Sequence, residues 1–437
     1  MNAAPVYPRT TPTVEEGRGG VPCQDHATGG LFLSGVPAKT LLLSCYACAP
    51  ATGTEPGFGW FTSRHLAAAG HRVHVLTRAG NRSAIESPSA DPHPRVTFHY
   101  VRLPPALRFL KEAGGPHYLL WQVAALVHAR RLLRAANVDI VHHVTYGSLQ
   151  GGSLLWALGR PFFFGPAGGG QMAPPQARRY FGTAWRQERL RSALTGLLTL
   201  SPLHHVLACR ATRMYATNAQ TARLMTRLGA KRVQLMLDSG VPDDLIASAV
   251  PARTDGALKI LWVGRLLRRK ALRLALESVA ELTVPVHLTV VGDGPDREEV
   301  PGWIEELGLQ GRVSVLGRVS WAQVMALYRE QDVFLFTSMR DSFGSQLLEA
   351  ASQGLPIVCL DHQGAGDFLP EGAALKVPLR GADTLATDVA AALTRFATLT
   401  DAQRRAMGEA ALTFARHHRW AEKADRYLRD YGERVGA

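Results

Sequence analysis

The sequence predicts an α/β protein built from two doubly wound, Rossmann-like domains. Strand-like apolar runs alternate with helical patterns over most of the 437 residues, and such alternation is typical of parallel sheets with helices on both faces. The alternation occurs twice, and a short, polar, proline-punctuated stretch at 241–257 separates the halves. A chain of this length can form two domains with separate cores. We therefore expect two domains that face each other across a central cleft, with a ligand at the carboxyl ends of the strands.

Each element follows from local pattern. Residues 1–38 are rich in Pro, Gly, Thr and Ala and lack periodicity, so we expect a disordered leader. An N-terminal domain at 39–245 and a C-terminal domain at 256–415 follow, and a helix at 416–437 is expected to pack back on the N-terminal domain. The strands expected in the two halves cover 40–46, 71–77, 96–101, 139–145, 161–165 and 214–218, then 259–264, 286–292, 313–317, 332–338 and 356–360.

The formal net charge of +13 implies acidic partners. Binding of nucleic acid is not expected, because there is no dense basic arm and few aromatic residues accompany the arginines. The arginine-rich segment 178–213 has an arginine face and a leucine face. It is either a helix packed on its own domain or a peripheral contact with an anionic membrane. Without a secretory signal pattern or a spanning apolar run, a cytoplasmic location is expected, with the inner face of the membrane as the alternative.

Two stretches of the second half carry the main chemical signal. Arg265 directly follows a strand and Lys270 opens the next helix, and two cations at a helix start can neutralise a diphosphate. In "DSFGSQLLEAASQGLPIV" (341–358), a glycine-containing turn opens a helix whose free N–H groups attract an anion. Asp341 and Glu349 would repel that anion, so these carboxylates fit neutral hydroxyl groups such as those of a sugar or ribose.

The order and spacing of these motifs resemble a known family. "VGRLLRRKA", "VVGDGP", "VLGRVS", "DVFLFTS" and the 341–358 stretch together resemble the second domain of the retaining nucleotide-sugar glycosyltransferases of family four (glycosyl transferases group one), which have the GT-B fold. The match runs from about 259 to 370. The family usually shows Glu-x7-Glu, and Asp341 replaces the first glutamate, which leaves the identity of the donor sugar open.

The resemblance implies roles for individual residues. Arg265 and Lys270 would hold the diphosphate, Asp341 the transferred sugar, and Glu349 the ribose. The remaining donor-binding candidates are Arg318 and Val319 near the base, and Phe343, Gly344 and Ser345 at the helix start.

The first half resembles the family more loosely, over about 40–240. A glycine loop with Glu55, Gly57 and Gly59, and a second glycine-rich strand end with Gly169, would border the phosphates and the acceptor. The family often places a histidine beside the reacting carbon. His142 and His143 are adjacent here, and alternation along a strand points them to opposite faces, so which one meets the cleft stays open. With Asp341, they are the catalytic candidates.

The resemblance implies a retaining, metal-independent transferase that moves a hexose-type sugar from a nucleotide-diphosphate sugar to a hydroxyl acceptor. The acceptor would be a saccharide, a lipid-linked or a small molecule, and no cofactor is implied. The alternatives are a non-catalytic nucleotide-sugar-binding protein and a sugar-nucleotide epimerase on the same fold.

Overall fold

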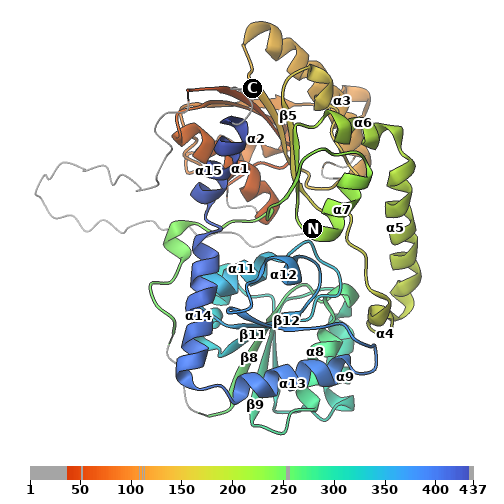
Figure 1. The fold of residues 1–437 in the computed structure, drawn as a ribbon, viewed down its shortest axis with the longest axis vertical. Coiled ribbons are helices and arrows are strands. Elements are labelled where there is room, and N and C mark those ends of the chain that lie inside the picture. Colours follow the sequence, from red (N-terminus) through yellow and green to blue (C-terminus); the bar gives the residue numbers. More distant parts are fainter. Residues whose placement is uncertain are drawn as a thin grey trace, which may run out of the picture.

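Two parallel sheets form the protein, as the sequence predicts. A computed structural model describes residues 37–50, 53–107, 109–110, 112, 114–251 and 256–432, so nearly all of the predicted leader lies outside the described residues. The N-terminal domain and the C-terminal domain stack end to end (Figure 1). Every strand pairing is parallel. The predicted pair of Rossmann-like domains is confirmed.

The N-terminal sheet has the strand order β3-β2-β1-β4-β5-β6-β7. Its strands are β1 Thr40–Cys45, β2 Arg72–Arg78, β3 Val96–Val101, β4 Ile140–Thr145, β5 Phe162–Ala167, β6 Arg213–Ala216 and β7 Val233–Leu235. The helices of this half are α1 Thr54–Ala68, α2 Arg82–Ile85, α3 Gly115–Ala135, α4 Arg178–Phe181, α5 Trp185–Leu197, α6 Pro202–Arg210 and α7 Ala219–Arg227. Residues of α3, α6 and α7 share a core on one face of the sheet, and α1 and α15 cover the other.

The C-terminal sheet has the order β10-β9-β8-β11-β12-β13. Its strands are β8 Leu258–Val263, β9 Val286–Val291, β10 Val313–Gly317, β11 Val333–Phe336, β12 Ile357–Leu360 and β13 Ala374–Val377. The helices are α8 Leu272–Ala280, α9 Val300–Glu306, α10 Trp321–Glu330, α11 Ser345–Ser352, α12 Gln363–Phe368, α13 Leu385–Ala397, α14 Asp401–Arg416 and α15 Trp420–Gly432. Helices α8, α9 and α13 cover one face, and α10, α11, α12 and α14 the other.

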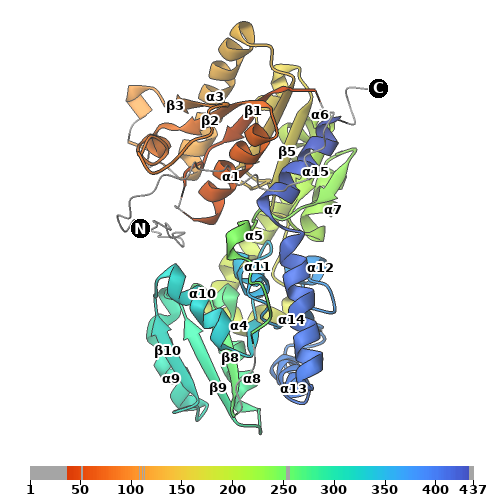
Figure 2. The ribbon, with the colours of Figure 1, turned by 90° about the vertical axis from the view of Figure 1, so that its left-hand side faces the viewer.

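The last helix returns to the N-terminal domain. Helix α14 packs on α11, and the chain then bends so that α15 lies against α1 (Figures 1 and 2). The ring of Trp420 lies 5.0 Å from that of Phe61 and 5.4 Å from that of Phe58, centroid to centroid. A bridge between Val241 and Arg419 joins this return to the interdomain connection. These aromatic contacts pack the start of α15 against α1.

A second crossing comes from the first half of the chain. Helix α4 lies beside the C-terminal domain, and α5 runs from there back toward α6 (Figure 1). Tyr180 and Phe181 are buried in the core that α8 and α13 form, and the Tyr180 hydroxyl donates to Glu277 at 3.0 Å. The α4 segment, although it lies within the sequence range 39–245, is therefore packed as a part of the C-terminal domain.

Candidate active site

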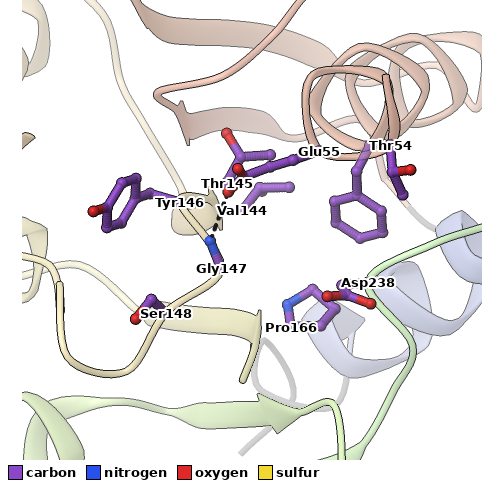
Figure 3. Close-up of a pocket in the computed structure, with 10 residues that line it drawn as sticks. Thr54, Glu55, Val144, Thr145, Tyr146, Gly147, Ser148, Pro166 and Asp238 are labelled. Carbon is purple, nitrogen blue, oxygen red and sulfur yellow. Dashed lines mark hydrogen bonds between the residues drawn. The ribbon is translucent and has the colours of Figure 1, made fainter. Parts of the chain in front are cut away.

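A cavity of about 340 Å³ opens at the carboxyl ends of the N-terminal strands. Its walls come from the start of α1, the end of β4 and the loop after it, β5, and the connection that follows β7 (Figure 3). The lining residues are Thr54, Glu55, Phe58, Val144, Thr145, Tyr146, Gly147, Ser148, Pro166 and Asp238. Hydroxyl groups, carboxylates and apolar surface are thus combined in one space, which suits a polar ring with hydrophobic faces.

The predicted glycine loop forms part of this wall. Glu55 lies in the first turn of α1, and its Oε1 accepts a hydrogen bond of 3.0 Å from the backbone N–H of Gly147 (Figure 3). Gly57 and Gly59 are buried on the inner side of α1. A Cβ at Gly59 would lie 2.6 Å from the carbonyl oxygen of Ala47. Close packing of α1 on the loop after β1 therefore requires glycine there, and Glu55 is held where it can reach the cavity.

Asp238 is a cavity residue that the sequence did not single out. Burial raises the pKa of its carboxyl to about 6, with Lys423 of α15 lowering it and Asp341 and Glu55 raising it. The charge of Asp341, in the other domain, is thus near enough to act on this carboxyl. Lys423 is buried, donates to the carbonyl oxygen of Leu237 at 2.8 Å, and has a pKa lowered by burial to about 7.

The two histidines lie inside the sheet, behind the cavity wall. Both are fully buried. The His142 ring joins the Tyr431 hydroxyl at 2.6 Å through Nδ1 and the Gly165 carbonyl oxygen at 2.8 Å through Nε2, and burial lowers its pKa to about 3. His143 stacks on Phe164 on the opposite face, and burial lowers its pKa to about 4. They do point to opposite faces, but neither lines the cavity.

The donor half of the site centres on a buried ion pair. The Lys270 ammonium binds the Asp341 carboxylate, and Arg269 lies 3.6 Å from the same oxygen. Burial alone would raise the pKa of Asp341, but the positive charges of Lys270 and Arg269 hold it below its usual value. Burial lowers the pKa of Lys270, against the pull of Asp341. Asp341 and Lys270 are therefore a preformed charged pair.

The start of α11 lies beside this pair. Gly344 precedes the helix with a φ of 101°, a conformation that favours glycine. No hydrogen bond is recorded between the backbone N–H groups of Phe343, Gly344 or Ser345 and any other described residue, so they can receive an anion. The Phe343 side chain is buried in the core and fixes this turn.

Glu349 lies one turn further along α11 and is almost fully buried. The Tyr328 hydroxyl donates to its Oε2 at 3.3 Å. Burial raises the pKa of Glu349 to about 7, although hydrogen bonds from Tyr328 and Trp321 lower it in part. This carboxyl titrates near neutral pH, as groups in ligand sites often do.

The remaining predicted residues lie at the rim. Arg265 is exposed, two residues after the end of β8. The preceding Gly264 packs closely on Gly292, where a Cβ would lie 1.8 Å from the Gly264 carbonyl oxygen. Arg318 is exposed, 3.8 Å from Asp293, and Val319 packs on the core below. No hydrogen bond or ion pair is recorded for Arg265 among the described residues, which leaves its guanidinium available to a ligand.

The second glycine-rich strand end touches the donor domain. Gly169 has a φ of 110°, and its carbonyl oxygen accepts from Gln150 at 2.6 Å. Beside it, Gln171 donates to the Ser342 hydroxyl at 3.3 Å across the domain boundary. This hydrogen bond places the strand end that carries Gly169 beside the turn that follows Asp341, at the boundary between the two domains. Within the described part of the chain, no group of three or more His, Cys, Asp or Glu residues is arranged to hold a metal ion.

Comparisons with known proteins identify the class. The model of "Glycosyl transferases group 1" matches residues 246–413, and that of "Glycosyl transferase 4-like domain" matches 62–237. The two matches fall on the two domains described above, so the chain is a glycosyltransferase. The two matches together span most of the chain, so it belongs to the GT4-type glycosyltransferases. The solved neighbours agree with it in fold, which is GT-B.

Individual relatives are more distant. D-inositol 3-phosphate glycosyltransferase of Stackebrandtia nassauensis is 26% identical over 98% of this chain and 96% of its own length. 2-deoxystreptamine N-acetyl-D-glucosaminyltransferase of Niallia circulans is 30% identical over 28% of this chain and 33% of its own.

Solved structures agree in fold. Sucrose-phosphate synthase from Thermosynechococcus elongatus has a TM-score of 0.63 at 17% identity, covering 91% of this chain and 99% of that one. HepE of Anabaena in complex with UDP has a TM-score of 0.55 at 17% identity, covering 90% and 98%.

Proposed function

We propose that this protein is a retaining transferase that moves a hexose-type sugar from a nucleotide-diphosphate sugar to an acceptor hydroxyl. The observation that carries the proposal is the arrangement of charges across the cleft. The Lys270–Asp341 pair and the start of α11 lie on one side, and a cavity with Glu55 and Asp238 lies on the other. An anionic leaving group and a hydroxyl-bearing acceptor fit these two sides respectively.

The donor would bind as a diphosphate between cations and helix N–H groups. The guanidinium of Arg265 can donate two hydrogen bonds to phosphate oxygens, and Lys270 supplies a buried positive charge. Backbone N–H groups in the first turn of α11 donate further hydrogen bonds to the diphosphate. These groups stabilise charge that develops as the glycosidic bond breaks, and preorganised donors of this kind contribute several kcal/mol. No metal is required in this scheme. HepE was solved with UDP, so UDP is the first nucleotide to test.

Retention would follow from attack on the face that the diphosphate leaves. The leaving phosphate oxygen can take the proton of the incoming hydroxyl, so no protein base is needed there. His142 and His143 would act as packing residues of β4, because burial keeps their pKa values near 3 and 4 and both rings are engaged. Asp341 would hold a hydroxyl of the transferred sugar with the oxygen that does not bind Lys270.

The acceptor would be neutral or cationic. Its cavity is lined by Glu55 and Asp238, by three hydroxyl side chains and by the phenol of Tyr146, and none of the lining residues carries a positive charge. A phosphate bound there would face two carboxylates without a partner, whereas hydroxyl or ammonium groups would be accepted. A peripheral contact with an anionic membrane, one of the two alternatives that the sequence leaves open for segment 178–213, remains part of the proposal because this segment carries exposed leucines.

A thermal-shift screen against UDP, GDP, ADP and TDP tests the donor site. A nucleotide at a hundred times its dissociation constant should add about 2.7 kcal/mol of stability. We expect the shift for one nucleotide to be lost in Lys270→Ala and Glu349→Ala and kept in Lys231→Ala and Glu371→Ala, two exposed positions away from the cleft.

No shift for any nucleotide with folded protein would refute the donor assignment. Product configuration, read by NMR of the anomeric proton, decides retention separately: an inverted product would overturn the mechanism and leave the donor site standing.

A further inference from the structure

Large apolar side chains are exposed along α5, the 3-10 turn Leu198–Leu200 and α6. We call them the leucine surface. Its members, with their exposed fractions, are Leu190 (63%), Leu194 (56%), Leu197 (55%), Leu200 (74%), Leu203 (51%) and Val206 (37%). Spacings of four and three residues place Leu190, Leu194 and Leu197 on one side of α5. Large apolar side chains gathered on the exposed side of consecutive elements often mark a binding surface.

The charges around the leucine surface are positive. Arg186 and Arg189 are exposed at the start of α5, and Arg210 is exposed at the end of α6. Glu188 is the one acidic residue between positions 172 and 210, and it is buried, with ion pairs to Arg191 at 3.0 Å and Arg340 at 2.8 Å. An apolar strip with a cationic rim and no exposed carboxylate matches the interface of an anionic bilayer.

The opposite side of α5 is committed to the protein. Thr195 is buried, and its hydroxyl accepts from Gln150 at 3.3 Å. Arg191 donates to the carbonyl oxygen of Gln171 at 2.6 Å. Among the described residues no single helix meets the length and hydropathy test for a membrane span, although the bent pair Pro175–Leu200 with Pro202–Arg210, at 65°, meets it jointly. Because the inner side of α5 is bound to the protein, this pair is suited to lie on a membrane rather than to cross it.

A second helix extends the apolar side of the molecule. Helix α3 exposes Leu119, Leu120, Val123 and Val127, and it covers the same sheet face as α6, since both contribute to one core. Figure 1 places α3, α6 and α5 along one side of the molecule. Exposed Arg130 and Arg131 follow this apolar stretch on α3, so it repeats the combination found on α5.

We propose that the leucine surface docks on the headgroup region of an anionic lipid bilayer, with its leucines inserted and Arg186, Arg189 and Arg210 at the phosphates. The inner side of α5 binds the loops that carry Gly169 and Gln171 at the cleft. Resting on the proposed function, this places the acceptor cavity where a lipid-linked hydroxyl acceptor can reach it from the membrane.

Co-sedimentation of the full chain with vesicles tests the docking. The vesicles are phosphatidylcholine with and without phosphatidylglycerol, at low and high salt. Leu194→Glu should weaken partitioning to the anionic vesicles on the order of tenfold, and Arg186→Glu with Arg189→Glu should also weaken it. The matched control is Leu316→Glu on β10, a leucine of similar exposure (46%) in the other domain, which should bind like the wild type.

Several outcomes would overturn the proposal. The first is that the wild type fails to bind anionic vesicles at low salt. The second is that it binds neutral and anionic vesicles equally well. The third is that Leu194→Glu and Leu316→Glu lose vesicle binding to the same extent. The nucleotide-induced thermal shift, measured on the same proteins, tests the donor site independently of membrane docking. Vesicle binding without a nucleotide shift would refute the donor site and support docking, and the reverse result would refute docking alone.

Discussion

Substitution of Glu349 by glutamine separates the charge of this carboxyl from its shape. Glutamine keeps the size of the side chain and the oxygen that accepts from Tyr328, but it cannot titrate. In the wild type, burial raises the pKa of Glu349 from 4.5 to about 7. The folded protein therefore keeps a proton at pH 6 that the unfolded chain has released, and this difference couples folding to pH.

The sign and size of the effect follow from that shift. Below about pH 4.5 the carboxyl is protonated in both the folded and the unfolded state, so it does not change the free energy of unfolding. Between about 4.5 and 7 the unfolded chain binds fewer protons than the folded one, so the free energy of unfolding falls as the pH rises. A difference of about 2.5 pKa units corresponds to about 3 kcal/mol at 1.36 kcal/mol per unit. Above pH 7 the loss is complete, and Glu349→Gln avoids it.

Urea unfolding followed by tryptophan fluorescence, at several pH values between 4.5 and 8 and without nucleotide, measures this difference. We expect Glu349→Gln to gain up to about 3 kcal/mol over the wild type across that range. Glu371→Gln, at an exposed position of the same domain, should run parallel to the wild type. Parallel profiles for Glu349→Gln and the wild type would refute the argument, because they would mean that the carboxyl is not perturbed by burial.

Three further substitutions, the first with a matched control, test the packing and the charges. Gly59→Ala should lose about 1–3 kcal/mol in urea unfolding, since its Cβ would lie 2.6 Å from a backbone carbonyl oxygen, whereas Gly196→Ala, with nothing within 4 Å, should be neutral or gain about 0.5–1 kcal/mol. Tyr431→Phe should cost about 1–2 kcal/mol and leave kcat unchanged; a tenfold drop in kcat at intact stability would instead give His142 a part in turnover. Asp341→Asn should cost about 3 kcal/mol or more, because it leaves a buried ammonium unpaired, and an unchanged melting temperature would contradict that pairing.

The sequence predicts the sheets well because buried parallel strands leave continuous apolar runs. The eleven expected strands all correspond to strands of the structure, with small shifts at the ends. Two edge strands were missed, β7 with three residues and β13 with four. Each is short and is interrupted by a polar side chain, VQL by Gln234 and ALKV by Lys376, so neither forms a continuous apolar run. Without β7 in the predicted sheet, no strand end precedes Asp238, so the sequence does not mark this residue as part of a site.

The two histidines show a second feature of the site that the sequence pattern cannot predict. Alternation along β4 correctly separates His142 and His143 onto opposite faces, but both faces of this central strand are covered, by α1 and α15 on one side and by α3 and α6 on the other. A cleft forms at the end of such a strand and not along its faces. The cavity is accordingly lined by Val144 and Thr145, and only the arrangement of helices in space reveals this.

The position of α4 could not be derived from local pattern either, and it bears on how the cleft can move. The hydrophobic residues of α4 indicate burial but not the domain in which they are buried. Tyr180 and Phe181 are held by the C-terminal core, and Arg340 ties the start of α5 to that domain through Glu188. Helix α6, in contrast, is packed in the N-terminal core. Because Thr195 and Arg191 of α5 also bind Gln150 and Gln171 of the N-terminal domain, α5 bridges the two domains. Any change in the angle between the domains must be accommodated along this bridge as well as at the 241–257 connection and at the bend between α14 and α15.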